Sequence, residues 1–248
     1  MLKRLVRPFV PPPVVHAWRR YAAGRIDRRF SQATPAEVFS AVYREKLWGT
    51  GADGEYCSGT GSYEDGILQP YIASVRAFLA AHPELSAAVD LGCGDFNVGA
   101  QLTTAFLEFV AVDVVAELIE RNAHRFQHLG AAFRCLDIVN DDLPPAEVAF
   151  VRQVLQHLSN AQVAKVVPKL YQYRWLIITE HLPCSPGFQV NRDKPAGPGV
   201  RARFGSGLVL TAPPFNLRPS EEHELCAVPC AAGTIQTVCY RMLPERPR

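Results

Sequence analysis

Three aspartates each end an apolar run between residues 87 and 137, and a glycine bend follows the first of them. In the stretch AVDLGCGDF, Asp90 precedes Gly92 and Gly94, which have no Cβ to keep the backbone away from a ligand. Asp113 ends the next run, 19 residues after Gly94, where an acid commonly binds two ribose hydroxyls. Asp137 ends the third run, at a place suited to accept from an adenine amino group. The spacing predicts a nucleoside site.

The charges around the glycine bend indicate which kind of nucleoside the site would bind. Asp90 lies before the bend and Asp95 after it, and two carboxylates repel a diphosphate. They suit a ligand with a positive end, such as an amino group or a sulfonium. Asn97 stands where a dinucleotide fingerprint has its third glycine. An NAD-dependent oxidoreductase is therefore the weaker alternative.

Elements of alternating type must position these acids. Apolar runs and helical spacing predict strands at 87–91, 109–113, 131–137, 147–153 and 175–180, and helices at 97–107, 115–126 and 160–172. Further helices are expected at 35–47 and 67–81, and two strands joined by a short loop at 223–229 and 234–242. This order predicts an α/β fold whose mostly parallel sheet has helices on both faces and ends in an antiparallel hairpin. The carboxyl ends of parallel strands share one edge, so the three aspartates should meet there.

With these motifs in place, residues 85–182 resemble the class I S-adenosylmethionine-dependent methyltransferases. AVDLGCGDF resembles their glycine-rich motif, AVDVVAE the acid after the second strand, RCLDIVNDDLP the adenine-side motif and FVRQVLQHLSN the segment after the fourth strand. Phe96 departs from the pattern, because many members have a third glycine there. The resemblance implies a Rossmann-like seven-stranded sheet and an enzyme that binds S-adenosyl-L-methionine. It implies that the cofactor contacts Asp90, Gly92, Cys93, Gly94, Asp113, Val114, Asp137, Ile138 and Gln153.

Methyl transfer to an amine or a hydroxyl can require a base near the carboxyl ends of the fourth and fifth strands. His157 follows the fourth strand, and the pair Glu180-His181 ends the fifth. We expect His181 or His157 to remove the proton, with Glu180 beside them. For either histidine, the alternative is a hydrogen-bonded structural role.

The acceptor is expected to be a small polar molecule, with a saccharide hydroxyl as the first hypothesis. The long segment 184–219 carries a polar, basic stretch that also includes Arg203. The predicted substrate contacts are Trp48, Arg152, Arg192, Lys194 and Arg201. Pro213-Pro214-Phe215 resembles part of a DNA amino-methyltransferase motif, but it follows the wrong strand and lacks the leading Asn or Asp. A nucleic-acid substrate is therefore disfavoured.

Composition sets the remaining bounds on the 248-residue chain. The net charge is +2, yet residues 1–30 hold eight of the 26 Lys and Arg residues, so the rest is net acidic and does not look like a nucleic-acid binder. No apolar run reaches the roughly 18 residues of a membrane span. Seven scattered cysteines without a CxxC pair favour a reducing, cytoplasmic location. Cys226 and Cys230 lie beside His223 without a second ligand pair, so no metal site is expected.

The predicted organisation is a basic, partly disordered arm followed by one domain. The boundaries are 1–34 for the arm and 35–248 for the domain, divided into a lid at 35–82, a cofactor core at 83–183, a substrate loop at 184–219 and a hairpin at 220–245. The arm could instead bring the protein to an anionic membrane surface, which suggests protein or lipid methylation there. A non-catalytic, cofactor-binding subunit is the non-enzyme alternative.

Overall fold

The fold is built on a seven-stranded sheet. The structure, a computed structural model, describes residues 29–30, 32–51, 56–230 and 233–243. The strands are β1 (Ala87–Leu91), β2 (Glu108–Asp113), β3 (Ala132–Cys135), β4 (Val148–Arg152), β5 (Trp175–Leu182), β8 (Glu221–Cys230) and β9 (Gly233–Arg241). Their order is β3-β2-β1-β4-β5-β9-β8; the first five are parallel and β9 runs antiparallel to β5 and β8. The expected parallel sheet with a C-terminal antiparallel hairpin is confirmed.

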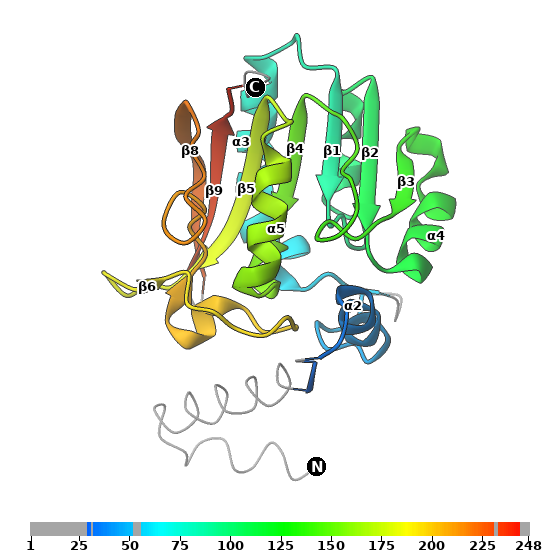
Figure 1. Cartoon of the computed structure of the whole chain (residues 1–248). Coiled ribbons are helices and arrows are strands. Elements are labelled where there is room, and N and C mark those ends of the chain that lie inside the picture. The colour runs from blue at the N-terminus through cyan, green and yellow to red at the C-terminus, as the bar shows by residue number, and fades with distance from the viewer. Residues whose placement is uncertain (1–28, 31, 52–55, 231–232, 244–248) are drawn as a thin grey trace.

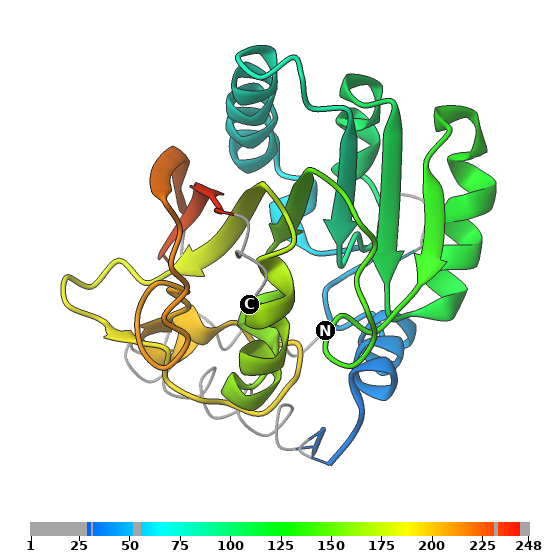
Figure 2. The ribbon, with the colours of Figure 1, turned by 45° about the horizontal axis from the view of Figure 1, so that its top comes forward.

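Helices cover both faces of the sheet (Figures 1 and 2). They are α2 (Pro35–Arg44), α3 (Asp65–Ala80), α4 (Ala116–Arg125) and α5 (Asn160–Leu170) among the described residues. Alternate residues of β1 face opposite clusters: Ala88 packs with α3, whereas Val89 packs with α5. A strand buried on both faces explains why β1 is apolar almost throughout. Capping boxes start two of the helices, Thr34 with Glu37 for α2 and Ser159 with Gln162 for α5.

The expectation of an α-helix at 97–107 is wrong. The segment forms two short 3₁₀ helices instead, η4 (Gly99–Gln101) and η5 (Thr103–Ala105). Gly99 packs so closely that a Cβ there would lie 2.4 Å from the ring of Phe96 and 2.8 Å from the carboxylate of Asp90. Phe96 itself is fully buried with φ of 63°. Anchoring of Phe96 in the core therefore sets the path of this segment, against the helical spacing of its apolar residues.

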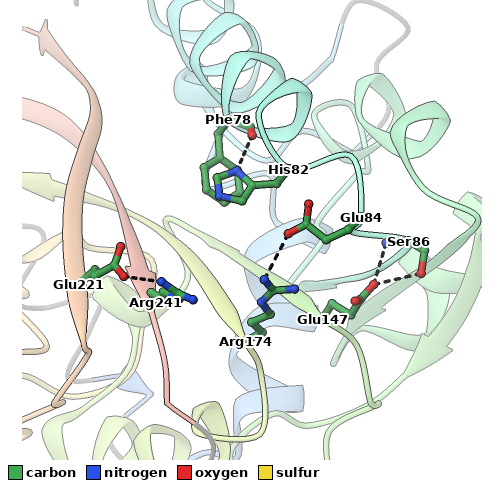
Figure 3. Close-up of polar contacts among 8 residues, drawn as sticks. All are labelled: Phe78, His82, Glu84, Ser86, Glu147, Arg174, Glu221 and Arg241. Atoms are coloured by element: carbon green, nitrogen blue, oxygen red, sulfur yellow. Dashed lines mark hydrogen bonds and ion pairs between the residues drawn. The ribbon is translucent and has the colours of Figure 1, made fainter.

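The amino ends of the strands are joined by polar contacts at the edge shown in Figure 3. The carboxylate of Glu147 accepts hydrogen bonds from the backbone N–H of Ser86 at 2.7 Å and from its Oγ at 3.0 Å, which links the starts of β4 and β1. Arg174 pairs with Glu84 at 3.2 Å beside them. Figure 1 shows α2 and the small strand β6 (Gln189–Val190) at the opposite, carboxyl edge, where the aspartates were expected to meet.

The lobe between β5 and β8 contains little regular structure. β6 pairs with β7 (Ser206–Gly207), and η8 (Arg201–Phe204) lies between them in sequence. The predicted arm at 1–34 falls mostly outside the described residues. No helix in the described ranges has both the length and the apolar character that a bilayer span requires.

Candidate active site

A cavity of about 580 Å³ opens at the carboxyl edge of the sheet. Its lining includes all nine residues that were expected to contact the cofactor: Asp90, Gly92, Cys93, Gly94, Asp113, Val114, Asp137, Ile138 and Gln153. Of the other predicted site residues, the lining includes Trp48, Arg152, His157 and His181 but not Glu180, Arg192, Lys194 or Arg201. The fold thus brings the residues predicted to contact the cofactor and two candidate bases to one cavity.

The glycines of the first turn are required by close contacts. Gly92 has φ of 82°, and a Cβ there would lie 2.5 Å from the side chain of Val154. Gly94 has φ of 56°, and its Cβ would lie 2.3 Å from the Oγ of Ser58. Both positive φ values strain other residues. The turn is therefore pressed between the segment after β4 and the segment that precedes α3.

Asp113 fixes the turn to the end of β2. Its Oδ2 accepts from the backbone N–H of Gly94 at 3.0 Å and its Oδ1 from that of Val115 at 3.1 Å. Burial raises the pKa of Asp113 while these backbone hydrogen bonds lower it. α4 begins at Ala116 and its N-cap is Val115, so Asp113 is not the helix cap. Each carboxylate oxygen retains a lone pair with which to accept from a ligand hydroxyl.

Asp90 and Asp137 differ in how they are bound. The carboxylate of Asp90 is buried and has no hydrogen-bond partner in the described part of the chain, and burial next to Asp113 raises its pKa to about 7. Asp137 organises its own turn, since Oδ1 accepts from Val139 N–H at 2.9 Å and Oδ2 from Asn140 Nδ2 at 2.7 Å. Asp90 is thus the acid best suited to a cationic ligand.

The expectation that Asp95 faces the same ligand is wrong. Asp95 is 3 % exposed, and its Oδ2 accepts from the backbone N–H of Ser58 at 2.7 Å and from the hydroxyl of Tyr63 at 2.9 Å. Its own N–H donates to the Oγ of Ser58 at 2.8 Å. Nearby, the Nδ2 of Asn97 donates to the carbonyl of Ser62 at 2.6 Å. Both polar residues after the turn hold the segment 58–63 over the cavity.

Trp48 joins this covering segment to the lobe. Its Nε1 donates to the carbonyl of Pro198 at 3.2 Å, and its ring lies 4.9 Å from the ring of His157, centroid to centroid. Residues that lie 150 positions apart in the chain thus close one side of the cavity. Trp48 was expected to contact the substrate, and it lines the cavity from this junction.

His157 is held by the protein on both ring nitrogens. Nδ1 donates to the carbonyl of Gly197 at 3.2 Å, and Nε2 lies 3.4 Å from the side-chain nitrogen of Gln156. Burial, with the nearby charge of Lys194, lowers the pKa of His157 to about 3. A ring so weakly basic is poorly matched to proton removal at neutral pH. Its geometry is that of the structural alternative.

His181 has a different environment. Its Nε2 lies 3.1 Å from the Sγ of Cys230, its backbone N–H donates to Gln156, and Nδ1 has no partner among the described residues. Burial and then the charge of Arg203 lower the pKa of His181, so the ring is neutral at pH 7. Cys230, which the sequence did not single out for this site, also lines the cavity.

The expected pairing of Glu180 with His181 is not formed. Adjacent strand residues face opposite sides of a sheet, and Glu180 lies outside the cavity lining. Its carboxylate is 5 % exposed with neither oxygen hydrogen-bonded in the described structure, and burial raises its pKa to about 8. Glu180 does not pair with Arg152 either; Arg152 donates to the carbonyl of Gly61 at 2.6 Å and lies over the ring of Tyr71.

Most basic residues of the lobe between β5 and β8 do not line the cavity, and two of them bond to backbone carbonyls. Arg201 is 1 % exposed and donates to the carbonyls of Leu158 and Arg192, and the Nζ of Lys194 donates to the carbonyl of Pro195 at 2.6 Å. The side chain of Arg192 is exposed outside the cavity. Arg203 is the lobe cation that lines the cavity among the described residues. In the described ranges, no group of three or more His, Cys, Asp or Glu side chains is arranged to hold a metal ion.

Comparison with known proteins places the architecture. No model of a protein family and no curated protein sequence matches this chain. Among solved structures, N-methyltransferase NodS from Bradyrhizobium japonicum WM9, in complex with S-adenosyl-L-homocysteine, is similar with a TM-score of 0.57 and 13 % identity, covering 81 % of this chain and 98 % of NodS. Human N-acetylserotonin methyltransferase in complex with SAM has a TM-score of 0.53 and 12 % identity over 91 % of this chain and 67 % of that protein. Magnesium protoporphyrin IX methyltransferase from Synechocystis PCC 6803 with bound SAH has a TM-score of 0.53 and 14 % identity, over 88 % of this chain and 98 % of that protein. This chain therefore has the Rossmann-like α/β fold of these three methyltransferases.

Proposed function

We propose that this protein transfers a methyl group from S-adenosyl-L-methionine to a small polar acceptor. The observation that carries the proposal is the grouping of Asp90, Asp113 and Asp137 around one cavity that also reaches His181. A volume of about 580 Å³ is in the range of pockets for small molecules and cofactors.

The cavity residues fit the proposed cofactor. Asp90 is a buried carboxylate with no hydrogen-bond partner in the described chain, which a cationic group would satisfy. The turn at Gly92 and Gly94 lets a ligand approach the backbone. We assign the ribose hydroxyls to Asp113, whose carboxylate oxygens each retain a lone pair beside their backbone hydrogen bonds. When bound, S-adenosyl-L-methionine supplies an activated methyl group. The acidic lining also disfavours the diphosphate of NAD.

We assign proton removal to His181. The ring is neutral at pH 7 because its pKa is lowered, and Nδ1 is not engaged by another described residue. A positioned base typically contributes ~10²–10⁴-fold to the rate. In this proposal the protein otherwise holds donor and acceptor in line. The segment 58–63, bonded to Asp95, and Trp48, bonded to Pro198, are assigned the exclusion of water.

A saccharide hydroxyl is the first acceptor we propose to test, on the basis of the polar segment 184–219. Protein or lipid methylation at a membrane surface is the second, and it depends on the basic residues 1–30. The test is transfer of labelled methyl groups from S-adenosyl-L-methionine into a fractionated extract, with the Asp113→Asn protein in parallel. Label in a small-molecule fraction that requires Asp113 supports the proposal; label only in lipid or protein favours the second acceptor. Absence of label with both proteins, together with absent cofactor binding, contradicts methyl transfer.

A further inference from the structure

The cavity lining is divided by charge. Its acidic residues come from the first part of the chain: Glu64, Asp90, Asp113 and Asp137. From position 150 onward, the described lining residues include two arginines but no Asp or Glu. The half of the cavity formed by β4, β5, the lobe and the hairpin therefore has a positive character, opposite to the nucleoside half.

The two arginines of this half differ in their contacts. Arg152 donates to Gly61 and Gln153, so its charge is already solvated by the protein. The guanidinium of Arg203 makes no hydrogen bond or ion pair with any residue in the described ranges, and its side chain is exposed. An uncompensated guanidinium in a ligand cavity is suited to bind an oxyanion in a bidentate manner.

The backbone at Arg203 is held in place by the contacts of Arg201. Arg201, two residues earlier in η8, is buried and donates to the backbone carbonyls of Leu158 and Arg192. The short helix is thus pinned to the segment after β4, and its second arginine is left at the cavity wall.

Arg203 and the proposed base, His181, line the same cavity. Its positive charge contributes to the lowered pKa of His181 and of His157, the two histidines of the lining. His181 lies 3.1 Å from Cys230, measured from Nε2 to Sγ, and both line the same cavity. An anion bound by Arg203 would therefore be held near the residue that takes the acceptor proton.

We propose that Arg203 binds a carboxylate or phosphate group of the acceptor, so that the substrate is a small anion. This inference rests on the proposed function, because it names the class of molecule that receives the methyl group. It assigns to Arg203 the substrate contact that was predicted from the sequence for Arg192, Lys194 and Arg201.

Cys230 provides a test that does not depend on catalysis. Its thiolate displaces iodide from iodoacetate, which is anionic, and from iodoacetamide, which is neutral and of similar size; a sulfur–carbon bond forms as the carbon–iodine bond breaks. Peptide mass spectrometry gives the ratio of the two rates at Cys230, with the exposed Cys184 and Cys135 as internal controls. We expect Arg203→Gln to lower the iodoacetate-to-iodoacetamide ratio at Cys230 by about threefold or more, since a nearby positive charge favours the anionic reagent. The ratio at Cys184 and Cys135 should not change.

Added anions form the second arm of the test. Phosphate or acetate, with ionic strength held constant by chloride, should slow iodoacetamide at Cys230 in the wild-type protein but not in Arg203→Gln. Protection by phosphate alone indicates a phosphorylated acceptor, and protection by acetate alone or by both indicates a carboxylate-type group. The exposed Arg218→Gln removes the same charge elsewhere in the chain and should behave as wild type.

The proposal is overturned if the rate ratio is the same with and without Arg203, or if neither anion protects Cys230. Calorimetry with S-adenosyl-L-homocysteine separates this result from the proposed function. Arg203→Gln should bind it as wild type does. A wild-type protein that fails to bind it would refute the cofactor assignment even if Arg203 attracts anions.

Discussion

The side-chain nitrogen of Asn97 donates a 2.6 Å hydrogen bond to the carbonyl oxygen of Ser62, 35 positions earlier in the chain. This contact joins the segment after the glycine turn to the segment that covers the cavity. Asp95 adds hydrogen bonds to Ser58 and Tyr63 in the same region. Asn97 stands where a dinucleotide fingerprint has its third glycine, and here it helps to hold the segment 58–63 over the cavity. We call the hydrogen bonds of Asn97 and Asp95 to this segment the latch.

Asn97→Ala should weaken this latch. One hydrogen bond contributes about 1 kcal/mol, so S-adenosyl-L-homocysteine should dissociate roughly fivefold faster. Stopped-flow tryptophan fluorescence measures the rate, with Trp48 as the tryptophan that lines the cavity among the described residues, and hydrogen exchange of 58–62 measures the opening. Gln127→Ala, on an exposed residue away from the cavity, is the control. An unchanged dissociation rate with unchanged exchange would contradict the latch.

Asp113→Asn should lower affinity for S-adenosyl-L-homocysteine by roughly 10- to 100-fold, because hydrogen bonds to a charged group contribute about 1.5–3 kcal/mol. The amide retains one oxygen for the backbone, so the thermal midpoint should fall only slightly. Glu108→Gln removes the same charge from the exposed start of β2 and should leave the affinity unchanged. Equal dissociation constants for all three proteins would refute the role of Asp113.

Asp90 should release a proton when a cationic cofactor binds near pH 7. Its pKa is raised to about 7 by burial, and a bound positive charge favours the ionised form. Affinity for S-adenosyl-L-methionine should therefore increase from pH 6 to pH 8. Calorimetry in two buffers of different ionisation enthalpy counts the protons released. The Asp90→Asn protein should release none from this site, and equal proton release from both proteins would argue against Asp90.

His181→Gln and His157→Gln should separate catalysis from structure. The first should lower turnover by ~10²–10⁴-fold with cofactor affinity retained. Because the pKa of His181 is lowered, the acid limb of the wild-type pH profile should have its midpoint below 6.5. His157→Gln should lower the thermal midpoint, since the ring packs against Trp48 and bonds Gly197. Full turnover in His181→Gln would refute its assignment as the base.

Glu180 should make the protein less stable in alkali. Its pKa is raised from 4.5 to about 8 by burial, so the folded state holds the proton more tightly than the unfolded state. This contribution to stability is complete below pH 4.5 and is lost as the pH rises through about 8. Glu180→Gln should therefore show a smaller fall in thermal midpoint between pH 6 and pH 9 than wild type or the exposed Glu222→Gln. Identical slopes in all three proteins would contradict the sign.

The sequence predicted the sheet well because strand burial and helix caps are local properties. The run from Ala87 to Leu91 and the capping box at Ser159 can be recognised without tertiary contacts. The segment at 97–107 could not be predicted, because its path is set by the close packing of Gly99 on Phe96.

The grouping of the acids was also accessible from spacing, since parallel strands bring Asp90 and Asp113 to one edge. The acceptor side was not. The sequence does not distinguish Arg201 from Arg203. Only the fold shows that Arg201 is buried and bonds to backbone carbonyls, whereas Arg203 lines the cavity. Likewise, Cys230 approaches His181 only through the antiparallel hairpin.

Isothermal titration of the wild-type protein with S-adenosyl-L-methionine, S-adenosyl-L-homocysteine and NAD tests the central claim most directly. The arrangement of Asp90, Asp113 and the glycine turn predicts saturable binding of both sulfur compounds and none of NAD. Binding of NAD without binding of either sulfur compound would contradict the account.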